Sequence, residues 1–235
     1  MTLEDLQIIY EDNHFIAVNK PSGALAQKDD TGDDILADVV KQYIKLQYDK
    51  PGDVFLGIIH RLDRPTSGAT IFARTSKGLE RMNKLFAEQK VQKTYYAVSR
   101  SRPEPYVGHL EHYLLKDSVK NIVHAYAFES KRNAGAKLAT LDYELVGDLD
   151  GYFLLKVNPH TGRQHQIRVQ LSQLGCPIIG DLKYGAKEKS RNERAIYLHC
   201  ERMEFIHPIK NEPVVIEADF PVDHLWSKIG KLVYS

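Results

Sequence analysis

The sequence predicts an α+β fold, in which a mixed, largely antiparallel β-sheet is flanked by a few helices. Short apolar runs with strand-like alternation recur along the 235 residues, whereas only a few segments have helical periodicity. No linker rich in proline, glycine or serine divides the chain. We therefore expect one domain spanning residues 1–235, with two lobes as a possible internal arrangement.

The first part of the chain leads to a loop between two strands. The expected elements are a hairpin (7–10 and 14–19) ended by Lys20-Pro21-Ser22-Gly23, a helix (Asp33–Gln47, capped by Asp33 or Thr31) and two strands (Val54–Ile59 and Ala69–Ala73). The loop His60–Gly68 joins these two strands.

The rest of the chain alternates strands with three helices. The expected elements are a helix (Ser76–Gln89), strands (Lys93–Ser99, 122–128, 138–146, 151–157), a helix (Thr161–Leu174, closed by Gly175), short strands (177–179, 196–199, 201–206, 213–218) and a last helix near 222–232. Lys77, Arg81 and Lys84 recur at helical spacing, which predicts a basic ridge on one helix.

Composition is ordinary for a globular protein, with 43% hydrophobic and 27% charged residues. The acidic N-terminus has no long apolar core, and no apolar run approaches the roughly 20 residues that span a bilayer. Cys176 and Cys200 lie far apart and neither has a C-x-x-C partner, which argues against a zinc site or a disulfide framework. We expect a cytoplasmic monomer that contacts no membrane and needs no metal or cofactor.

Charge is distributed unevenly, although the formal net charge is only +1. Residues 1–53 contain 11 acidic residues and 5 lysines, whereas residues 61–93 contain 8 basic and 3 acidic residues. Residues 151–180 contain no acidic residue. If the two basic segments meet in the fold, they form a positive face suited to a polyanion. Uneven charge without a partner is the alternative.

The loop His60–Gly68 reads HRLDRPTSG and is the most informative segment of the chain. It places Asp63 close to Arg61 and Arg64 at the end of a predicted strand. Loops on a rigid scaffold often carry function, and a carboxylate held ionised by cations acts as a nucleophile or base. Taken alone, the loop also fits a surface aspartate in an arginine-rich turn.

A second segment, KTYYA at residues 93–97, has the alternation of a strand. Lys93, Tyr95 and Ala97 then share one face, and Tyr96 takes the other. One tyrosine can enter the core while the other faces a cleft, where its ring can stack on a base. Two core tyrosines are the alternative.

A third segment, NPHTGRQHQIRVQ at residues 158–170, is expected to begin a helix at Thr161 or Gly162. Free backbone amides there would form an anion site, which Arg163 reinforces. His165 and Arg168 are three residues apart, so they are neighbours on one helical face, and Arg168 is suited to hold a carboxylate. A solvated basic helix is the alternative.

Together with the opening IIYEDNHFIAVNKPSG, these segments resemble the signature motifs of the RluA-type pseudouridine synthases. The third motif continues through LSQLGCPIIGDLKYG, and the resemblance spans about residues 7 to 220. It implies an isomerase that converts specific uridines in structured rRNA or tRNA to pseudouridine. Such an enzyme flips the uridine out of its stack and uses no cofactor.

The resemblance also implies residue roles. Asp63 matches the catalytic aspartate, Tyr95 the tyrosine that packs on the target base, and Arg168 the basic residue paired with the aspartate. Arg61 matches an arginine that enters the space left by the flipped nucleotide, and Ile167 would help to hold the ring. Further residues expected to bind substrate or shape the loop are His60, Arg64, Thr66, Ser67, Gly68, Arg163 and His165. Expected phosphate contacts are Lys20, Arg64, Lys77, Arg81, Lys84 and Arg163.

Two departures from the family concern RNA selection. Arg64-Pro65 stands where many relatives have less rigid or less charged residues, which would stiffen the loop and add a phosphate contact. The catalytic pattern begins almost at Met1, so we expect no separate N-terminal RNA-binding module.

Two other functions stay open at this point. A non-catalytic RNA-binding protein on the same scaffold would not need Asp63. A glycoside hydrolase would need a second carboxylate about 5–10 Å from Asp63, for which Asp142, Glu144 and Asp181 are candidates. His60 with His165 alone would make a poor metal site.

Overall fold

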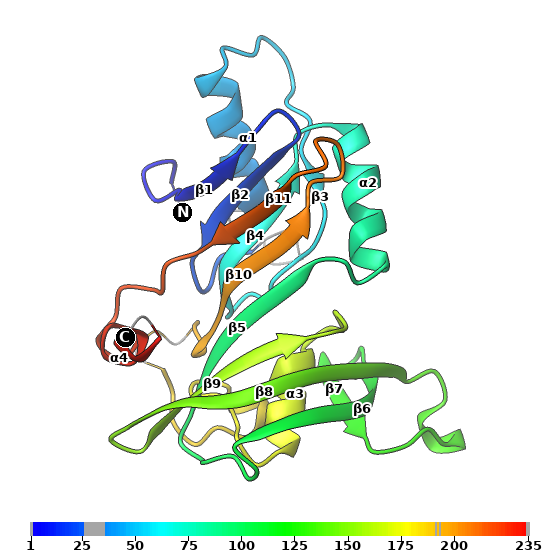
Figure 1. Ribbon diagram of the computed structural model, residues 1–235, viewed down its shortest axis with the longest axis vertical. Helices are drawn as coiled ribbons and strands as arrows, with labels where there is room; N and C mark the ends of the chain where they lie inside the picture. The colour runs from blue at the N-terminus through cyan, green and yellow to red at the C-terminus, as the bar shows by residue number, and fades with distance from the viewer. Residues whose placement is uncertain (1, 26–35, 191, 193, 234–235) are drawn as a thin grey trace. The chain divides into compact units, whose positions relative to one another are not determined.

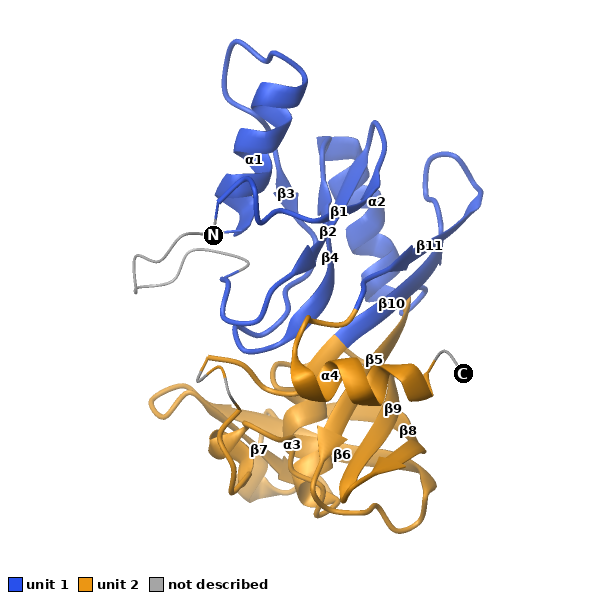
Figure 2. Ribbon diagram, turned by 90° about the vertical axis from the view of Figure 1, so that its left-hand side faces the viewer, with its two compact units in different colours: residues 1–91, 200–219 blue, residues 92–199, 220–235 orange. Residues whose placement is uncertain are grey.

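The computed structural model describes residues 2–25, 36–190, 192 and 194–233. The chain forms two compact units, each built from two separate stretches of sequence (Figure 2). Unit 1 comprises residues 1–91 and 200–219, and unit 2 comprises residues 92–199 and 220–235. Eight of the strand pairs are antiparallel, which confirms the predicted α+β class with a largely antiparallel sheet.

In unit 1 the strand order is β1-β2-β4-β10, with β3 beside β4 and β11 beside β10 (Figure 1). The strands are β1 (Ile8–Glu11), β2 (Phe15–Lys20), β3 (Gly57–Ile58), β4 (Ser67–Ala73), β10 (Leu198–Ile206, with residues 198 and 199 in unit 2) and β11 (Pro213–Glu217). All residues of β4 are buried, which explains its continuous apolar sequence.

Each face of the β2–β4 pair carries one helix. Helix α1 (Leu36–Gln47) shares a core cluster with Ile16, Val18 and Phe72. Helix α2 (Ser76–Ala87) starts on the opposite face, beside Phe15, and Thr75 caps it by accepting a hydrogen bond from the Gly78 N–H at 3.1 Å. The predicted cap at Thr31 or Asp33 lies outside the described residues.

In unit 2 the strand order is β5-β9-β8-β6-β7 (Figure 1). The strands are β5 (Gln92–Ser99), β6 (Val107–Asp117), β7 (Ile122–Tyr126), β8 (Lys137–Leu149) and β9 (Tyr152–Pro159). The helices are α3 (Gln166–Gln173), α4 (His224–Ile229) and the single-turn 3-10 helices Lys131–Asn133, Leu182–Tyr184 and Gly230–Leu232. Helix α3 buries Val169 on one face of this sheet, against Leu114 and Ala139.

Several predicted elements differ from the structure. Strand β6 was not predicted, because its residues are mostly half-buried or exposed and its sequence, VGHLEHYLLKD, mixes histidine and glutamate with leucine. The predicted strand Val54–Ile59 shortens to β3, residues 177–179 form only a bridge from Ile178 to Ser99, and residues 196–199 and 201–206 merge into β10. Within the described part of the chain, no helix is both long and apolar enough to cross a bilayer.

Candidate active site

The loop that carries Asp63 begins where β3 leaves β4. Beyond the end of β3, the imidazole of His60 takes the place of a strand neighbour on β4. Its Nε2 accepts a hydrogen bond from the Ile71 N–H at 3.1 Å. The same ring stacks on Phe86 of α2, with centroids 5.2 Å apart. The loop then closes a turn in which the Thr66 N–H donates to the Asp63 carbonyl at 3.0 Å. Asp63 is half-buried and its neighbour Arg61 is exposed.

A second group of contacts holds the loop from the Lys20–Gly23 segment. The Arg64 carbonyl accepts from the Gly23 N–H at 2.8 Å and from Lys20 Nζ at 3.1 Å. Lys20 Nζ also donates to the Pro21 carbonyl at 3.1 Å, and Arg64 Nε donates to the Gly23 carbonyl at 3.2 Å. Arg64 therefore joins its loop to the segment that follows β2.

Lys20 was predicted to contact phosphate, and this is wrong because its exposed fraction is 0%. Burial lowers the pKa of Lys20 to about 7, with Asp63 opposing and Arg64 adding to the effect. A neutral amine still supplies a hydrogen to both carbonyls. Lys20 is thus a buried titratable group within electrostatic reach of Asp63.

Thr66, Ser67 and Gly68 are buried where the loop enters β4. Gly68 has a φ of +114°, and a Cβ built there would lie 2.2 Å from the Cys200 carbonyl oxygen of β10. Only glycine fits this close approach. The burial of these three residues supports the loop-shaping part of their predicted role.

Unit 2 carries the second group of predicted residues. Tyr95 pairs with Val157 and Tyr96 with Lys156, so the two tyrosines occupy opposite faces of β5, as predicted. Tyr96 packs edge-to-face on Phe220 with centroids 5.4 Å apart. Strand alternation from Ala139 through Tyr143 and Val157 places Tyr95 on the face that α3 covers.

The predicted helix start at Thr161 or Gly162 is wrong, because α3 begins at Gln166 and His165 is its N-cap. The preceding residues form a loop that the Gln166 side chain holds. Its Oε1 accepts from the Thr161 hydroxyl at 2.7 Å and from the Arg163 N–H at 3.0 Å. The anion site predicted from a helix terminus there is not formed, although Arg163 is exposed.

Arg168 is held by a partner that the sequence did not indicate. Its Nε donates to Asp181 Oδ2 at 2.7 Å and its Nη2 to Asp181 Oδ1 at 2.8 Å. The two side chains are 6% and 1% exposed. This bidentate pair fixes the plane of the guanidinium.

Tyr184 links the same helix to β7. Its hydroxyl lies 2.7 Å from His165 Nδ1 and accepts from the Val123 N–H at 2.9 Å, and Arg168 Cζ is 5.1 Å from its ring centroid. His165 and Arg168 both contact Tyr184, but His165 is the N-cap of α3 and does not share a helical face with Arg168 as predicted. Asp181 and Tyr184 lie in GDLKYG, the end of the third motif. This segment is part of the family resemblance, but these contacts were not predicted from the sequence.

The family model described as RNA pseudouridylate synthase matches residues 14–173. This chain belongs to that family. The predicted RluA-type resemblance is confirmed, and with it the assignment of the chain as an RNA pseudouridine synthase, an isomerase.

Two curated relatives of this synthase show how far the similarity extends. The tRNA pseudouridine synthase C of Vibrio parahaemolyticus serotype O3:K6 is 33% identical over 242 residues, covering 96% of this chain and 94% of the relative. The ribosomal large subunit pseudouridine synthase C of Rickettsia felis is 34% identical over 217 residues, covering 91% of this chain and 67% of the relative.

A solved structure supports the fold of the synthase. Human RNA Pseudouridylate Synthase Domain Containing 4 aligns with a TM-score of 0.75 and 24% identity, covering 92% of this chain and 89% of that chain.

The basic ridge predicted on α2 is present in the synthase, since Lys77, Arg81 and Lys84 are all exposed. Arg81 Nη1 donates to the Pro208 carbonyl at 2.9 Å, and Lys84 Nζ lies 3.9 Å from Glu88. Neither contact buries the charge. The ridge is therefore open to solvent and to a polyanion.

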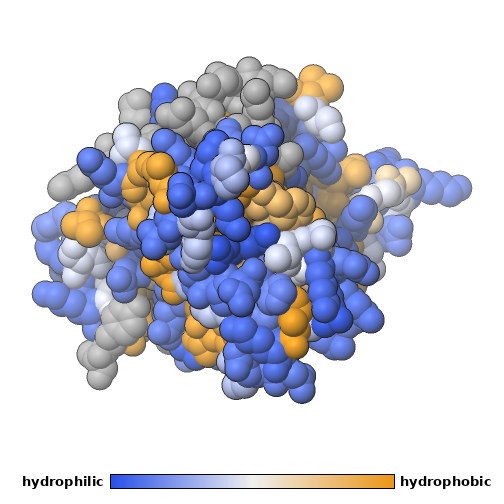
Figure 3. Space-filling view, turned by 90° about the horizontal axis from the view of Figure 1, so that it is seen from above, coloured by the Kyte–Doolittle hydropathy of each residue, from blue (hydrophilic) through white to orange (hydrophobic). Residues whose placement is uncertain are grey.

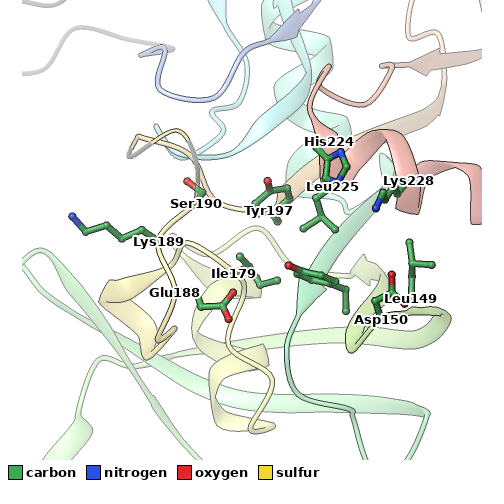
Figure 4. Close-up of a pocket in the computed structure, with 11 residues that line it drawn as sticks. Leu149, Asp150, Ile179, Glu188, Lys189, Ser190, Tyr197, His224, Leu225 and Lys228 are labelled. Atoms are coloured by element: carbon green, nitrogen blue, oxygen red, sulfur yellow. The ribbon is translucent and has the colours of Figure 1, made fainter.

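Unit 2 of the synthase also contains a pocket of about 320 Å³ (Figure 4). Its lining mixes charges of both signs with apolar side chains: Leu149, Asp150, Tyr152, Ile179, Glu188, Lys189, Ser190, Tyr197, His224, Leu225 and Lys228. The third motif contributes Ile179 to this lining, whereas none of the predicted catalytic or substrate-binding residues is part of it.

Proposed function

We propose that this synthase isomerises specific uridines in structured RNA, with Asp63 as its catalytic residue. The observation that carries the proposal is the fixation of the Asp63 loop. His60 anchors the start of the loop, and the turn from Asp63 to Thr66 closes it. Buried Lys20 donates a hydrogen bond to the Arg64 carbonyl within it. A half-buried carboxylate on a loop whose backbone is held in this way is suited to act as a nucleophile or base on a flipped nucleotide.

The second part of the proposed site comes from unit 2. Tyr95 would pack on the flipped uracil, with Ile167 helping to hold it, and Arg168 would pair with Asp63. The bidentate contact with Asp181 supports this role, because it locks the guanidinium in one orientation. Exposed Arg61 would occupy the space that the flipped base leaves.

The proposed reaction is balanced without a co-reactant. The bond from N1 of uracil to the ribose breaks, the base turns, and its C5 forms the new bond to the same carbon. The proton lost from C5 is matched by one gained at N1. Neither oxidation nor net hydrolysis occurs, so the reaction needs no more than positioning, charge and the nucleophile or base that Asp63 would provide.

The proposed substrates are tRNA, rRNA or both. The relatives above are named for one or the other, and the exposed ridge of Lys77, Arg81 and Lys84 would contact phosphates. Exposed Arg163 would add to this surface.

We place the activity in the cytoplasm, on a monomer. The face shown in Figure 3 is mostly hydrophilic with its hydrophobic residues scattered, so this face offers no broad apolar surface to a second copy. Sedimentation of the purified chain tests this, and a stable dimer would contradict it.

The glycoside hydrolase alternative loses support from two of its candidate second acids. Asp181 is buried in its pair with Arg168, and Asp142 accepts hydrogen bonds from two histidines. Neither is a free proton donor of the kind that chemistry needs.

A pseudouridine map of total RNA tests the proposal, using carbodiimide-dependent reverse-transcription stops in cells with and without the gene. We expect one or more discrete sites to disappear and to return with the wild-type protein. Asp63→Asn is expected not to restore them, whereas Asp53→Asn, a change at an exposed aspartate of the same unit, is expected to restore them fully. Restoration by Asp63→Asn would remove Asp63 from catalysis and favour the non-catalytic RNA-binding alternative.

A further inference from the structure

A cluster of two histidines and one aspartate lies on the exposed face of the unit 2 sheet. His109 on β6 is the cross-strand partner of Asp142 on β8, and His160 follows the last residue of β9. His109 Nδ1 lies 2.7 Å from Asp142 Oδ1, and His160 Nε2 lies 2.7 Å from Asp142 Oδ2. We call these three residues the His–Asp–His cluster.

The donor atoms of the His–Asp–His cluster converge closely enough for one ion. Each residue offers one ligand atom, and all of these atoms lie within 4.8 Å of one another. The two imidazoles are nearly parallel, with an interplanar angle of 28° and centroids 6.0 Å apart. A metal at about 2.0–2.2 Å from each ligand needs only small side-chain rotations to bring these atoms together.

Hydrogen bonds hold the turn beside the cluster, whereas the cluster side chains are about half exposed. Thr140 fixes the turn at His160, because its carbonyl accepts from the His160 N–H at 3.0 Å and its N–H donates to Thr161 Oγ1 at 3.0 Å. The cluster side chains are 47–52% exposed, so an ion reaches them from solvent and water can complete its coordination. Strand alternation places Asp142 on the face of the sheet opposite Tyr95 and α3.

The chemistry of the ligands selects the class of ion. To bind the ion, each imidazole gives up its hydrogen bond to Asp142 and turns that nitrogen's lone pair to the metal, with its proton on the other ring nitrogen. Two imidazoles and one carboxylate suit zinc and similar transition ions, whereas magnesium and calcium prefer oxygen ligands.

We propose that His109, Asp142 and His160 form a binding site for a divalent transition metal ion, with zinc as the best match. This departs from the expectation of a metal-free protein, which considered only His60 with His165. The ion ties β6 and β8 to the turn that leads into the third motif. It is therefore a structural or regulatory ion rather than part of the reaction.

Zinc titration of the full-length, untagged, chelator-treated protein tests the proposal, with a chromophoric chelator as competitor. We expect one saturable Zn²⁺ per chain. His109→Gln, Asp142→Asn and His160→Gln are each expected to weaken binding by about tenfold or more, because each removes one of three ligands. His124→Gln is the matched control, since His124 is an exposed strand histidine outside the cluster, and it is expected to bind like wild type.

Two further readouts complete the test. The wild type is expected to melt at a higher temperature with zinc, while the three cluster variants, which must match the wild-type circular dichroism without metal, show no such rise. Magnesium is expected to compete only at far higher concentration. Any one of three results would overturn the proposal: no saturable zinc binding by the wild type, zinc binding by all three cluster variants as tight as that of the wild type, or magnesium binding as tight as zinc binding.

Discussion

Replacing Lys20 with methionine is expected to remove a specific pH dependence from the stability of this protein. The amine is fully buried and its pKa is lowered from an ordinary 10.5 to about 7. Between these two values the unfolded chain binds a proton at Lys20 that the folded chain does not. The free energy of unfolding of the wild type therefore rises with pH over this window and is flat below about pH 7 with respect to this group.

The magnitude follows from the two pKa values. At roughly 1.4 kcal/mol per pH unit, the full difference of about 3.5 units corresponds to about 5 kcal/mol. Between pH 7 and pH 9.5 the free energy of unfolding is expected to rise by about 3 kcal/mol. The rise is smaller than the full difference because pH 7 lies at the folded-state pKa and pH 9.5 lies below the unfolded-state pKa. In Lys20→Met this contribution is absent, so the difference between the two proteins isolates it from the titration of other groups.

Urea denaturation at pH 6, 7, 8 and 9.5 measures this effect. The matched control is Lys77→Met, which removes an exposed lysine from the same unit and should follow the wild-type curve. Parallel pH profiles for the wild type and Lys20→Met would refute the reasoning, because they would mean that the buried amine keeps an ordinary pKa.

Two further substitutions test the supports of the site. Gly68→Ala puts a Cβ 2.2 Å from a backbone oxygen at a φ of +114°. It should lower the free energy of unfolding by about 3 kcal/mol or more and abolish RNA modification. The control Gly52→Ala, at a position with open space around it, should do neither. A Gly68→Ala protein as stable as wild type in urea would show that β10 yields at this point. Asp181→Asn weakens the buried pair with Arg168 and should cost about 3–5 kcal/mol in the same assay, while exposed Asp148→Asn should cost almost nothing. A loss below 1 kcal/mol would mean that the pair contributes little.

Local patterns predicted the elements whose sequence and environment agree. The first hairpin, α2 with its apolar stripe, and the strands β5, β8 and β9 all lie close to their expected ranges. The opposite facing of Tyr95 and Tyr96 followed from strand alternation alone. The Asp63 loop was found because its whole string, rather than any single residue, carries the signal.

Features that depend on contacts distant in sequence were not predictable in this way. Lysine at position 20 looks like a surface residue until the loop at Arg64, 44 residues later, covers it. The pairing of Arg168 with Asp181 requires the turn after α3 to bring them together. The late start of α3 follows from the Gln166 side chain, whose hydrogen bonds stabilise a loop that propensity alone favours as helix.

The two-part composition of unit 1 sets an order on its assembly. During synthesis residues 1–91 emerge first, but β10 and β11 follow only after residues 92–199, nearly half of the chain, have been made. Until then β4 lacks its β10 neighbour, and Gly68 lacks the Cys200 backbone against which it packs. The part of this β4 edge that β3 and His60 do not cover must remain unpaired through this interval, which makes it the natural place for a chaperone to act or for aggregation to begin. The loop that carries Asp63 is thus supported completely only in a chain whose second unit has already been synthesised.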